Sequence, residues 1–224
     1  MKLSPLGDQG VLAYFADEAI AVRFAAAVRD AAPRWLFDVV PAYASVGVFF
    51  DADQITTSEV TAWLGSLPPS DALHTTDTTR HFTIPMCYEM QLDLARVCEA
   101  TGLSADDVIR LHTATAYTVY AVGFVPGFPY LGYLPKALCG VGRLPSPRVR
   151  VEPRSVGLTG RQTGIYPLAR PGGWNLIGRT PLTIVDVESG FFPLRVGDAV
   201  RFARIDEKRY RELEGERLED TRPT

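Results

Sequence analysis

The sequence predicts an α+β fold that is mostly β, with an antiparallel sheet and two helices followed by a β-barrel. Runs such as VGVFF at 46–50 indicate strands, and apolar residues three or four positions apart indicate helices. After about residue 120, glycine and proline recur at short intervals, which is typical of the turns between short barrel strands.

The first part of the chain is predicted to follow the order βαββαβ. The expected elements, in that order, are 11–15, 19–32, 36–43, 45–51, 58–67 and 80–88. Their simplest packing is an antiparallel sheet with both helices on one face, the ferredoxin-like arrangement. The polar stretch 68–80 is the predicted boundary, which gives domains of 1–80 and 81–224.

Two helices and a set of short strands are predicted in the second part. The helices are expected at about 91–101 and 104–115, because Gly102 is a helix stop and Ser104 is a helix start. The segments that follow, such as SVGLTG, TGIYPL and LTIVDV, are predicted to be strands of a compact barrel. The charged stretch DEKRYRELEGERLEDTRPT predicts a short surface helix.

Composition indicates an ordinary soluble globular protein and excludes several classes of function. The 224 residues are 46% hydrophobic and 22% charged. A net charge of -3, without a long run of Lys and Arg, argues against nucleic-acid and membrane surfaces. No segment has the length of a membrane span and no leader pattern precedes the first acidic residues, so we expect a cytoplasmic protein.

Motifs for disulfides, metals and phosphate loops are missing from the sequence. Cys87, Cys98 and Cys139 have no CxxC spacing, so neither a disulfide framework nor a structural zinc site is expected. No GxxxxGK[ST], HExxH or GxSxG pattern occurs. The segment GLTGRQTG has the glycines of a phosphate loop, but it lacks the lysine and lies among predicted strands.

The stretch from Gly123 to Arg179 predicts a concave binding surface. Glycine permits tight turns and close approaches there, and proline fixes the backbone between them. Aromatic bodies with polar edges stand among these constraints: Tyr130, Tyr133, Tyr166 and Trp174. The alternative is that these residues only close the corners of a barrel.

His112 is the histidine inside a strongly patterned segment, whereas His74 and His81 lie in or beside the polar boundary stretch. It shares a predicted helix face with Val108 and Ile109, so burial is expected. One interpretation is a core histidine bonded to the backbone. The other is an acid–base group that reaches a site at the GFVPGF corner.

Arginines recur in a region that has little lysine, which favours an anionic ligand. They are Arg148, Arg150, Arg154, Arg161, Arg170 and Arg179. The alternative is that they decorate the barrel rim and pair with Asp186 or Glu188. Gln162 and Thr163 add hydrogen-bonding groups, so the whole set is typical of a binding surface more than of a catalytic centre.

Several segments carry a resemblance to a known family. They are IPMCY at 84–88, the stretch 101–135, SVGLTGRQTGIYP at 155–167, PGGWNLIGRTPL at 171–182 and VGDAVRF at 196–202. The chain resembles the B-type subunit of the bacterial ATP-dependent 5-oxoprolinase, also described as allophanate hydrolase subunit 1 or KipI-like. GDQGVLAYF at 7–15 and VPAYASVGVFFD at 40–51 resemble the same family, so nearly the whole chain is covered.

The resemblance implies a ferredoxin-like N-terminal domain and a cyclophilin-like β-barrel. It implies a component that acts with A-type and C-type subunits to open 5-oxo-L-proline to L-glutamate with ATP, for which Mg²⁺ is expected. The implied catalytic residues are His112, Gln162 and Thr163. The residues expected to bind substrate are Phe124, Pro126, Arg148, Arg150, Tyr166, Trp174 and Arg179, and no metal ligands are expected in this chain.

Some positions depart from the family pattern. Arg161 stands where a small residue is usual and could narrow the pocket or add a charge, and GYLPKAL replaces a GGL-Asp segment. Glu152 and Arg154 replace part of a Pro-Ala-Gly run. Two other functions stay open: a regulatory inhibitor of a sensor histidine kinase, and a carboxyltransferase-type component of a urea- or amide-degrading system. The chain has no biotin-accepting MKM motif.

Overall fold

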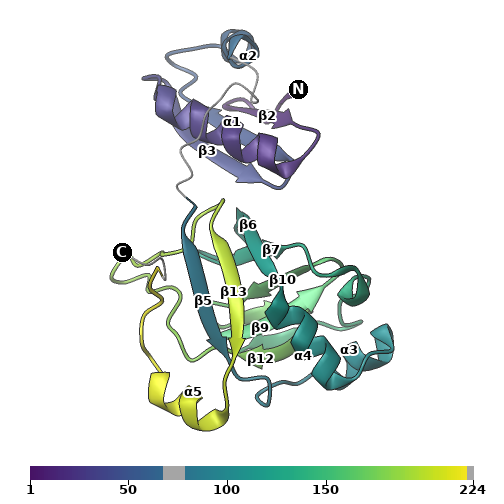
Figure 1. Ribbon diagram of the computed structural model, residues 1–224. Coiled ribbons are helices and arrows are strands. Elements are labelled where there is room, and N and C mark those ends of the chain that lie inside the picture. Colours follow the sequence, from purple (N-terminus) through teal and green to yellow (C-terminus); the bar gives the residue numbers. More distant parts are fainter. Residues whose placement is uncertain (68–78, 221–224) are drawn as a thin grey trace. The chain divides into compact units, whose positions relative to one another are not determined.

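The computed structural model describes residues 1–67 and 79–220, and the chain forms two compact units, Met1–Thr78 and Thr79–Thr224 (Figure 1). Most of the predicted boundary stretch 68–80, with His74, lies outside the described residues. The fold is mixed α+β and mostly β, as predicted.

The first unit is a four-stranded antiparallel sheet with two helices. Its elements are β1 (Lys2–Pro5), β2 (Gly10–Tyr14), α1 (Glu18–Ala31), β3 (Leu36–Ala42), β4 (Ser45–Phe50) and α2 (Thr57–Ser66). The strand order is β1-β2-β4-β3. Both helices contribute to one core with the alternate residues Val11, Val46 and Val48, so both pack on the same face of the sheet.

The helix boundaries in this unit follow from their caps. The Asp17 side chain accepts from the Ile20 N–H at 2.9 Å, which satisfies a donor at the start of α1. Thr56 and Glu59 form a capping box at the start of α2. Neither cap needs a distant partner, so the sequence alone defines these ends.

The predicted sixth element of the βαββαβ order is wrong for this sheet. β5 (His81–Met86) belongs to the second unit, where it pairs in parallel with β13 (Ala199–Arg204). The sheet edge beside β2 is occupied instead by β1, a strand that was not predicted from the sequence. In β5, Phe82, Ile84 and Met86 alternate into the larger core, and the pairing with β13 places the strand in the sheet of the second unit.

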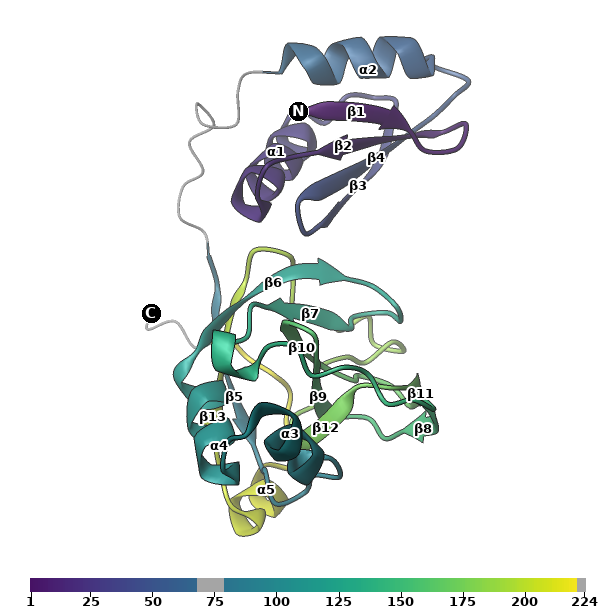
Figure 2. The same ribbon diagram turned by 90° about the vertical axis from the view of Figure 1, so that its right-hand side faces the viewer.

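The second unit is built on a seven-stranded sheet in the order β12-β9-β10-β7-β6-β13-β5. The strands not yet given are β6 (Ala116–Val122), β7 (Pro129–Gly132), β9 (Ser155–Thr159), β10 (Gln162–Ile165) and β12 (Asn175–Arg179). The sheet curls until its edges meet at one point, where Cys87 and Arg179 exchange backbone hydrogen bonds of 2.8 and 3.0 Å. A two-stranded ribbon of β8 (Arg148–Val151) and β11 (Arg170–Gly172) lies beside the β9–β12 end (Figure 2).

Helices complete the second unit close to where the sequence predicts them. α3 (Leu94–Thr101) ends at Gly102, whose φ of +72° is the left-handed conformation that glycine favours. α4 (Ala105–Ala114) begins after Ser104, which accepts from the Asp107 N–H at 3.1 Å. The charged C-terminal stretch forms α5 (Glu207–Leu213), and a short 3-10 helix, η2, spans Lys136–Leu138.

Candidate functional site

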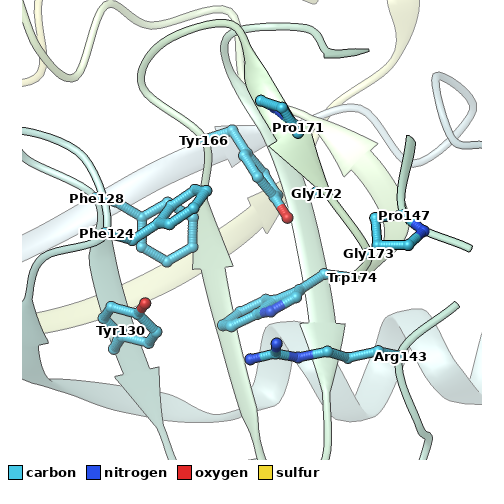
Figure 3. A pocket seen from close by; sticks show the side chains of 10 residues that line it. All are labelled: Phe124, Phe128, Tyr130, Arg143, Pro147, Tyr166, Pro171, Gly172, Gly173 and Trp174. Carbon is cyan, nitrogen blue, oxygen red and sulfur yellow. The ribbon is translucent and has the colours of Figure 1, made fainter. Parts of the chain in front are cut away.

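An open cavity of about 290 Å³ lies in the second unit, and we call it the aromatic pocket (Figure 3). It is lined by Phe124, Phe128, Tyr130, Arg143, Pro147, Tyr166, Pro171, Gly172, Gly173 and Trp174. Of the residues expected to bind substrate, the structure brings Phe124, Tyr166 and Trp174 together here. Three segments, 124–130, 143–147 and 166–174, supply its walls.

Ring-to-ring packing builds the pocket. Phe128 packs edge-on against Tyr166, with ring centroids 5.2 Å apart, and against Trp174 at 5.5 Å. Glycines permit this closeness, because a Cβ at Gly172 would lie 2.8 Å from Cε1 of Tyr166, and one at Gly164 would lie 2.9 Å from Cζ of Phe128. The glycine-rich motifs therefore serve to bring the aromatic rings together.

Two tyrosine hydroxyls give the aromatic pocket its hydrogen-bond donors. Burial raises the pKa of Tyr166, although a hydrogen bond with the backbone of Trp174 and nearby positive charge partly offset the effect. Burial also raises the pKa of Tyr130. Both hydroxyls are therefore protonated at neutral pH and can donate to a ligand. The Tyr166 hydroxyl points toward Gly172 (Figure 3).

Arg143 supplies the positive charge of the aromatic pocket and was not among the residues predicted from the sequence. Its side chain runs below the Trp174 indole (Figure 3), and its charge acts on the hydroxyls of both Tyr130 and Tyr166. Its loop is held from both sides: Asn175 Nδ2 donates to the Gly142 carbonyl at 2.9 Å, and the Leu144 N–H donates to the Gly173 carbonyl at 2.7 Å. The feature of the sequence that could have identified Arg143 is its position between a glycine turn and the LPSP turn.

Arg148, which was expected to bind substrate, does not line the aromatic pocket and forms an ion pair with Asp93. Its Nη2 donates to Oδ1 of Asp93 at 2.7 Å, and the Asp93 side chain is only 8% exposed. The other oxygen of Asp93 accepts from the Leu176 N–H at 2.7 Å. This partly buried ion pair joins β8, β12 and the start of α3 and helps to hold the framework around the pocket, and a role of Arg148 in substrate binding stays a prediction.

His112, predicted to be catalytic, lies in a group that we call the His112 cluster, with Tyr88 and Thr163. Its side chain is fully buried, and its ring stacks on Phe202 with centroids 4.6 Å apart. The Thr163 hydroxyl donates to the Gly157 carbonyl at 2.9 Å, so His112 Nε2 donates to Thr163 Oγ1 at 3.1 Å. His112 Nδ1 then accepts from the Tyr88 hydroxyl at 2.6 Å.

Burial decides the charge of the His112 cluster. Desolvation lowers the pKa of His112 to about 3 and raises that of Tyr88, so both groups are neutral at pH 7. Neither His112 nor Thr163 lines the aromatic pocket. The burial of His112 is that of a core histidine, but its ring nitrogens bond to side chains and not to the backbone as that interpretation expected. A direct catalytic role for either residue stays a prediction.

The other predicted site residues lie outside the aromatic pocket. Gln162 is half-buried on β10, and Pro126 is exposed on the corner before β7. The Arg161 guanidinium lies over the Tyr133 ring at 4.5 Å and does not line the pocket, so it does not narrow it. Among the departures from the family pattern, Arg154 donates to the Pro181 carbonyl at 3.1 Å and pairs with Glu214 at 2.9 Å.

Arg150 and Arg179 line a different cavity of about 350 Å³, which we call the second cavity. Residues of β8 and β12 line this cavity together with Glu152. The residues expected to bind substrate are therefore divided between two cavities.

Within residues 1–67 and 79–220, no group of three or more His, Cys, Asp and Glu side chains is arranged to hold a metal ion. In the same part of the chain, no helix combines the length and the apolar character needed to span a membrane.

Residues 1–191 match the family model described as carboxyltransferase domain, subdomain C and D. The chain belongs to this family. A Bacillus subtilis (strain 168) protein, named as the B-type subunit of 5-oxoprolinase, is 34% identical, and the match covers 93% of this chain and 95% of that protein. The family resemblance inferred from the sequence is thereby confirmed.

Solved structures of similar proteins agree with the fold. TTHA0988 is 38% identical with a TM-score of 0.76; the match covers 88% of this chain but only 40% of TTHA0988. The chain described here therefore spans about two fifths of the length of TTHA0988. The Kluyveromyces lactis urea carboxylase has a TM-score of 0.72 at 16% identity, over 97% of this chain and 23% of that chain, which shows a shared fold.

Proposed function

We propose that this chain is one component of a multi-subunit ATP-dependent 5-oxoprolinase, which opens 5-oxo-L-proline to L-glutamate together with A-type and C-type subunits. The observation that carries the proposal is the aromatic pocket with Arg143. The nearly full-length likeness to a protein named as the B-type subunit of 5-oxoprolinase supports it. The ferredoxin-like and cyclophilin-like assignments of the two units belong to the same proposal.

The chemistry of the aromatic pocket suits this substrate. 5-Oxoproline is a small five-membered lactam with one carboxylate. The flat faces of Tyr166 and Trp174 suit the ring, and the guanidinium of Arg143 suits the carboxylate. The hydroxyls of Tyr130 and Tyr166 can donate to the lactam oxygen.

The proposed role of this chain is to bind and orient the lactam. A lactam amide is a poor electrophile, and phosphorylating its oxygen creates a leaving group that couples ring opening to ATP hydrolysis. Neutral tyrosine donors can stabilise charge that develops on that oxygen. We propose that ATP, with Mg²⁺, binds at a site shared with or located on a partner protein, and that the complex is cytoplasmic.

A second candidate is a carboxyltransferase-type component of a urea- or amide-degrading system. The family model that matches residues 1–191 favours it, because its description names a carboxyltransferase domain. The same aromatic pocket would then hold a planar amide. Biotin-linked carboxyl transfer with a partner protein, without release of glutamate, distinguishes this candidate.

The test is ATP-dependent release of glutamate from 5-oxoproline, with the chain co-purified with and without its presumed A-type and C-type partners. We expect activity only from the full set. Arg143→Gln should raise the KM for 5-oxoproline about tenfold or more, because a charge-assisted hydrogen bond to the carboxylate is lost. Arg161→Gln is the matched control, since Arg161 stacks on Tyr133 outside the pocket, and its KM should not change.

An intact, stable complex that releases no glutamate would exclude the 5-oxoprolinase function. If Arg143→Gln and Arg161→Gln give the same KM as the unmodified chain in an active complex, the aromatic pocket is not the place where the carboxylate binds.

A further inference from the structure

The second cavity has the dimensions and the lining of a ligand site. Its volume of about 350 Å³ is in the range of small-molecule pockets. Apolar groups form much of its wall, including Leu92, Val151 and Leu176, and Leu92 is 68% exposed. An exposed leucine at the edge of a cavity lined by other apolar side chains favours an apolar ligand body.

The wall of the second cavity is fixed by the backbone. The N–H groups of Leu92 and Asp93 both donate to the Leu176 carbonyl, at 3.2 and 2.9 Å. The Leu176 N–H donates in turn to Asp93 Oδ2 at 2.7 Å. The loop before α3 is thus tied to β12 by three hydrogen bonds, and a ligand would meet a wall that is already ordered.

The side chains that line the second cavity carry a net charge of +1, from Arg150, Arg179 and Glu152. Arg150 and Glu152 compensate each other through hydrogen bonds of 2.7 and 3.2 Å, which lower the pKa of Glu152. Arg179 forms no ion pair with a carboxylate in the described part of the chain. Its Nη2 donates to the Pro153 carbonyl at 3.1 Å, and its buried Nε has no partner among the described residues. The charge of Arg179 also lowers the pKa of Glu152, but the Arg179 guanidinium is the cationic group at this cavity that has no ion-pair partner among the described residues.

We propose that the second cavity binds a small organic carboxylate with an apolar body, at a site separate from the aromatic pocket. The carboxylate binds the Arg179 guanidinium through a charge-assisted hydrogen bond, because a guanidinium suits a carboxylate. The apolar body packs on Leu92, Val151 and Leu176. This inference goes beyond the proposed function and does not depend on it.

The test uses the full chain and a matched pair of probes, 4-methylpentanoate and its neutral amide. Binding is measured by calorimetry and by NMR shifts of the methyl groups of Met90, Leu92 and Leu176. We expect the acid to bind at least tenfold more tightly than the amide, as a charge-assisted hydrogen bond requires. The shifts should map to the second cavity, and Arg143→Gln should leave the affinity unchanged.

Two variants should move the affinity for the acid in opposite directions. Arg179→Gln should lower it about tenfold and remove the preference over the amide. Glu152→Gln should raise it severalfold, because a repelling charge is removed and Arg150 is released. Glu152 is 53% exposed, so this variant is expected to fold normally.

Equal binding of the acid and the amide would overturn the proposal. So would an affinity that responds to Arg143→Gln but not to Glu152→Gln, because the acid would then occupy the aromatic pocket. Neither result depends on glutamate release, so this proposal and the proposed function can fail separately.

Discussion

The aromatic pocket and the His112 cluster use similar side chains in opposite surroundings. Each places a nitrogen-bearing side chain near tyrosine hydroxyls. In the cluster, both ring nitrogens of His112 have partners within the core, whereas Arg143 is exposed at an open pocket. Burial, and not the residue types, therefore separates a group that holds the core together from one that can contact a ligand.

Replacing His112 should have the largest effect on stability. His112→Ala leaves the hydroxyl of Tyr88 and the side chain of Thr163 without their ring partner and opens a cavity beside Phe202. We expect the free energy of unfolding to fall by about 3 kcal/mol or more, measured by urea denaturation. Activity per folded molecule should change less than threefold. A loss of a hundredfold or more in a folded variant would instead support the predicted catalytic role.

The pH dependence of stability gives the next largest effect. The folded-state pKa of His112 is about 3, below its ordinary value of 6.5, so the unfolded chain binds more protons between these values. The stabilisation is complete above pH 6.5 and is lost as the pH falls toward 3. From pH 7 to pH 5 this should remove about 2 kcal/mol from the free energy of unfolding.

His112→Gln is the control for this pH dependence, because it keeps a neutral hydrogen-bonding side chain that does not titrate. Its free energy of unfolding should lack the His112 contribution between pH 7 and pH 5. If the free energy of unfolding falls equally with pH in the two proteins, the pKa of His112 is not lowered in the folded state.

A smaller effect tests the packing of the aromatic pocket. In Gly172→Ala the added Cβ would overlap the Tyr166 ring, which should lower the free energy of unfolding by about 1–3 kcal/mol. Gly173→Ala is the matched control, because its Cβ would meet Pro147 at an ordinary 3.6 Å. If both variants unfold at the same urea concentration, the glycine is not needed for the position of Tyr166.

The smallest effect on stability is expected at the open site. Arg143→Gln removes an exposed side chain, so the free energy of unfolding should change by less than about 0.5 kcal/mol. If urea denaturation shows a larger loss in the free energy of unfolding, Arg143 stabilises the fold as His112 does. The proposed difference between the exposed and the buried residue would then be wrong.

Local chemistry explains why much of the secondary structure could be predicted. The capping residues Asp17, Thr56 and Ser104 act within three residues of their targets, and Gly102 ends α3 by its own backbone conformation. Strand partners could not be predicted this way. The alternation of β5 shows that one face is buried, but not which of two sheets buries it.

The candidate site was predicted in part for the same reason. Tyr166 and Trp174 stand out by their glycine-rich surroundings, and they do meet in the aromatic pocket. The site or partner that each arginine reaches could not be predicted from the sequence, because each long side chain has several partners within reach. The structure directs Arg143 to the aromatic pocket, Arg148 to Asp93 and Arg179 to the second cavity.

The family, the helix ends and the glycine-rich stretch in which the aromatic rings gather could be predicted from short motifs, because these depend on neighbours a few residues apart. The packing of distant segments was needed to show that β1 and not β5 completes the first sheet, that His112 is buried in the core, and that two cavities form. Those outcomes depend on contacts between segments far apart in the chain, whose free energies local patterns do not contain.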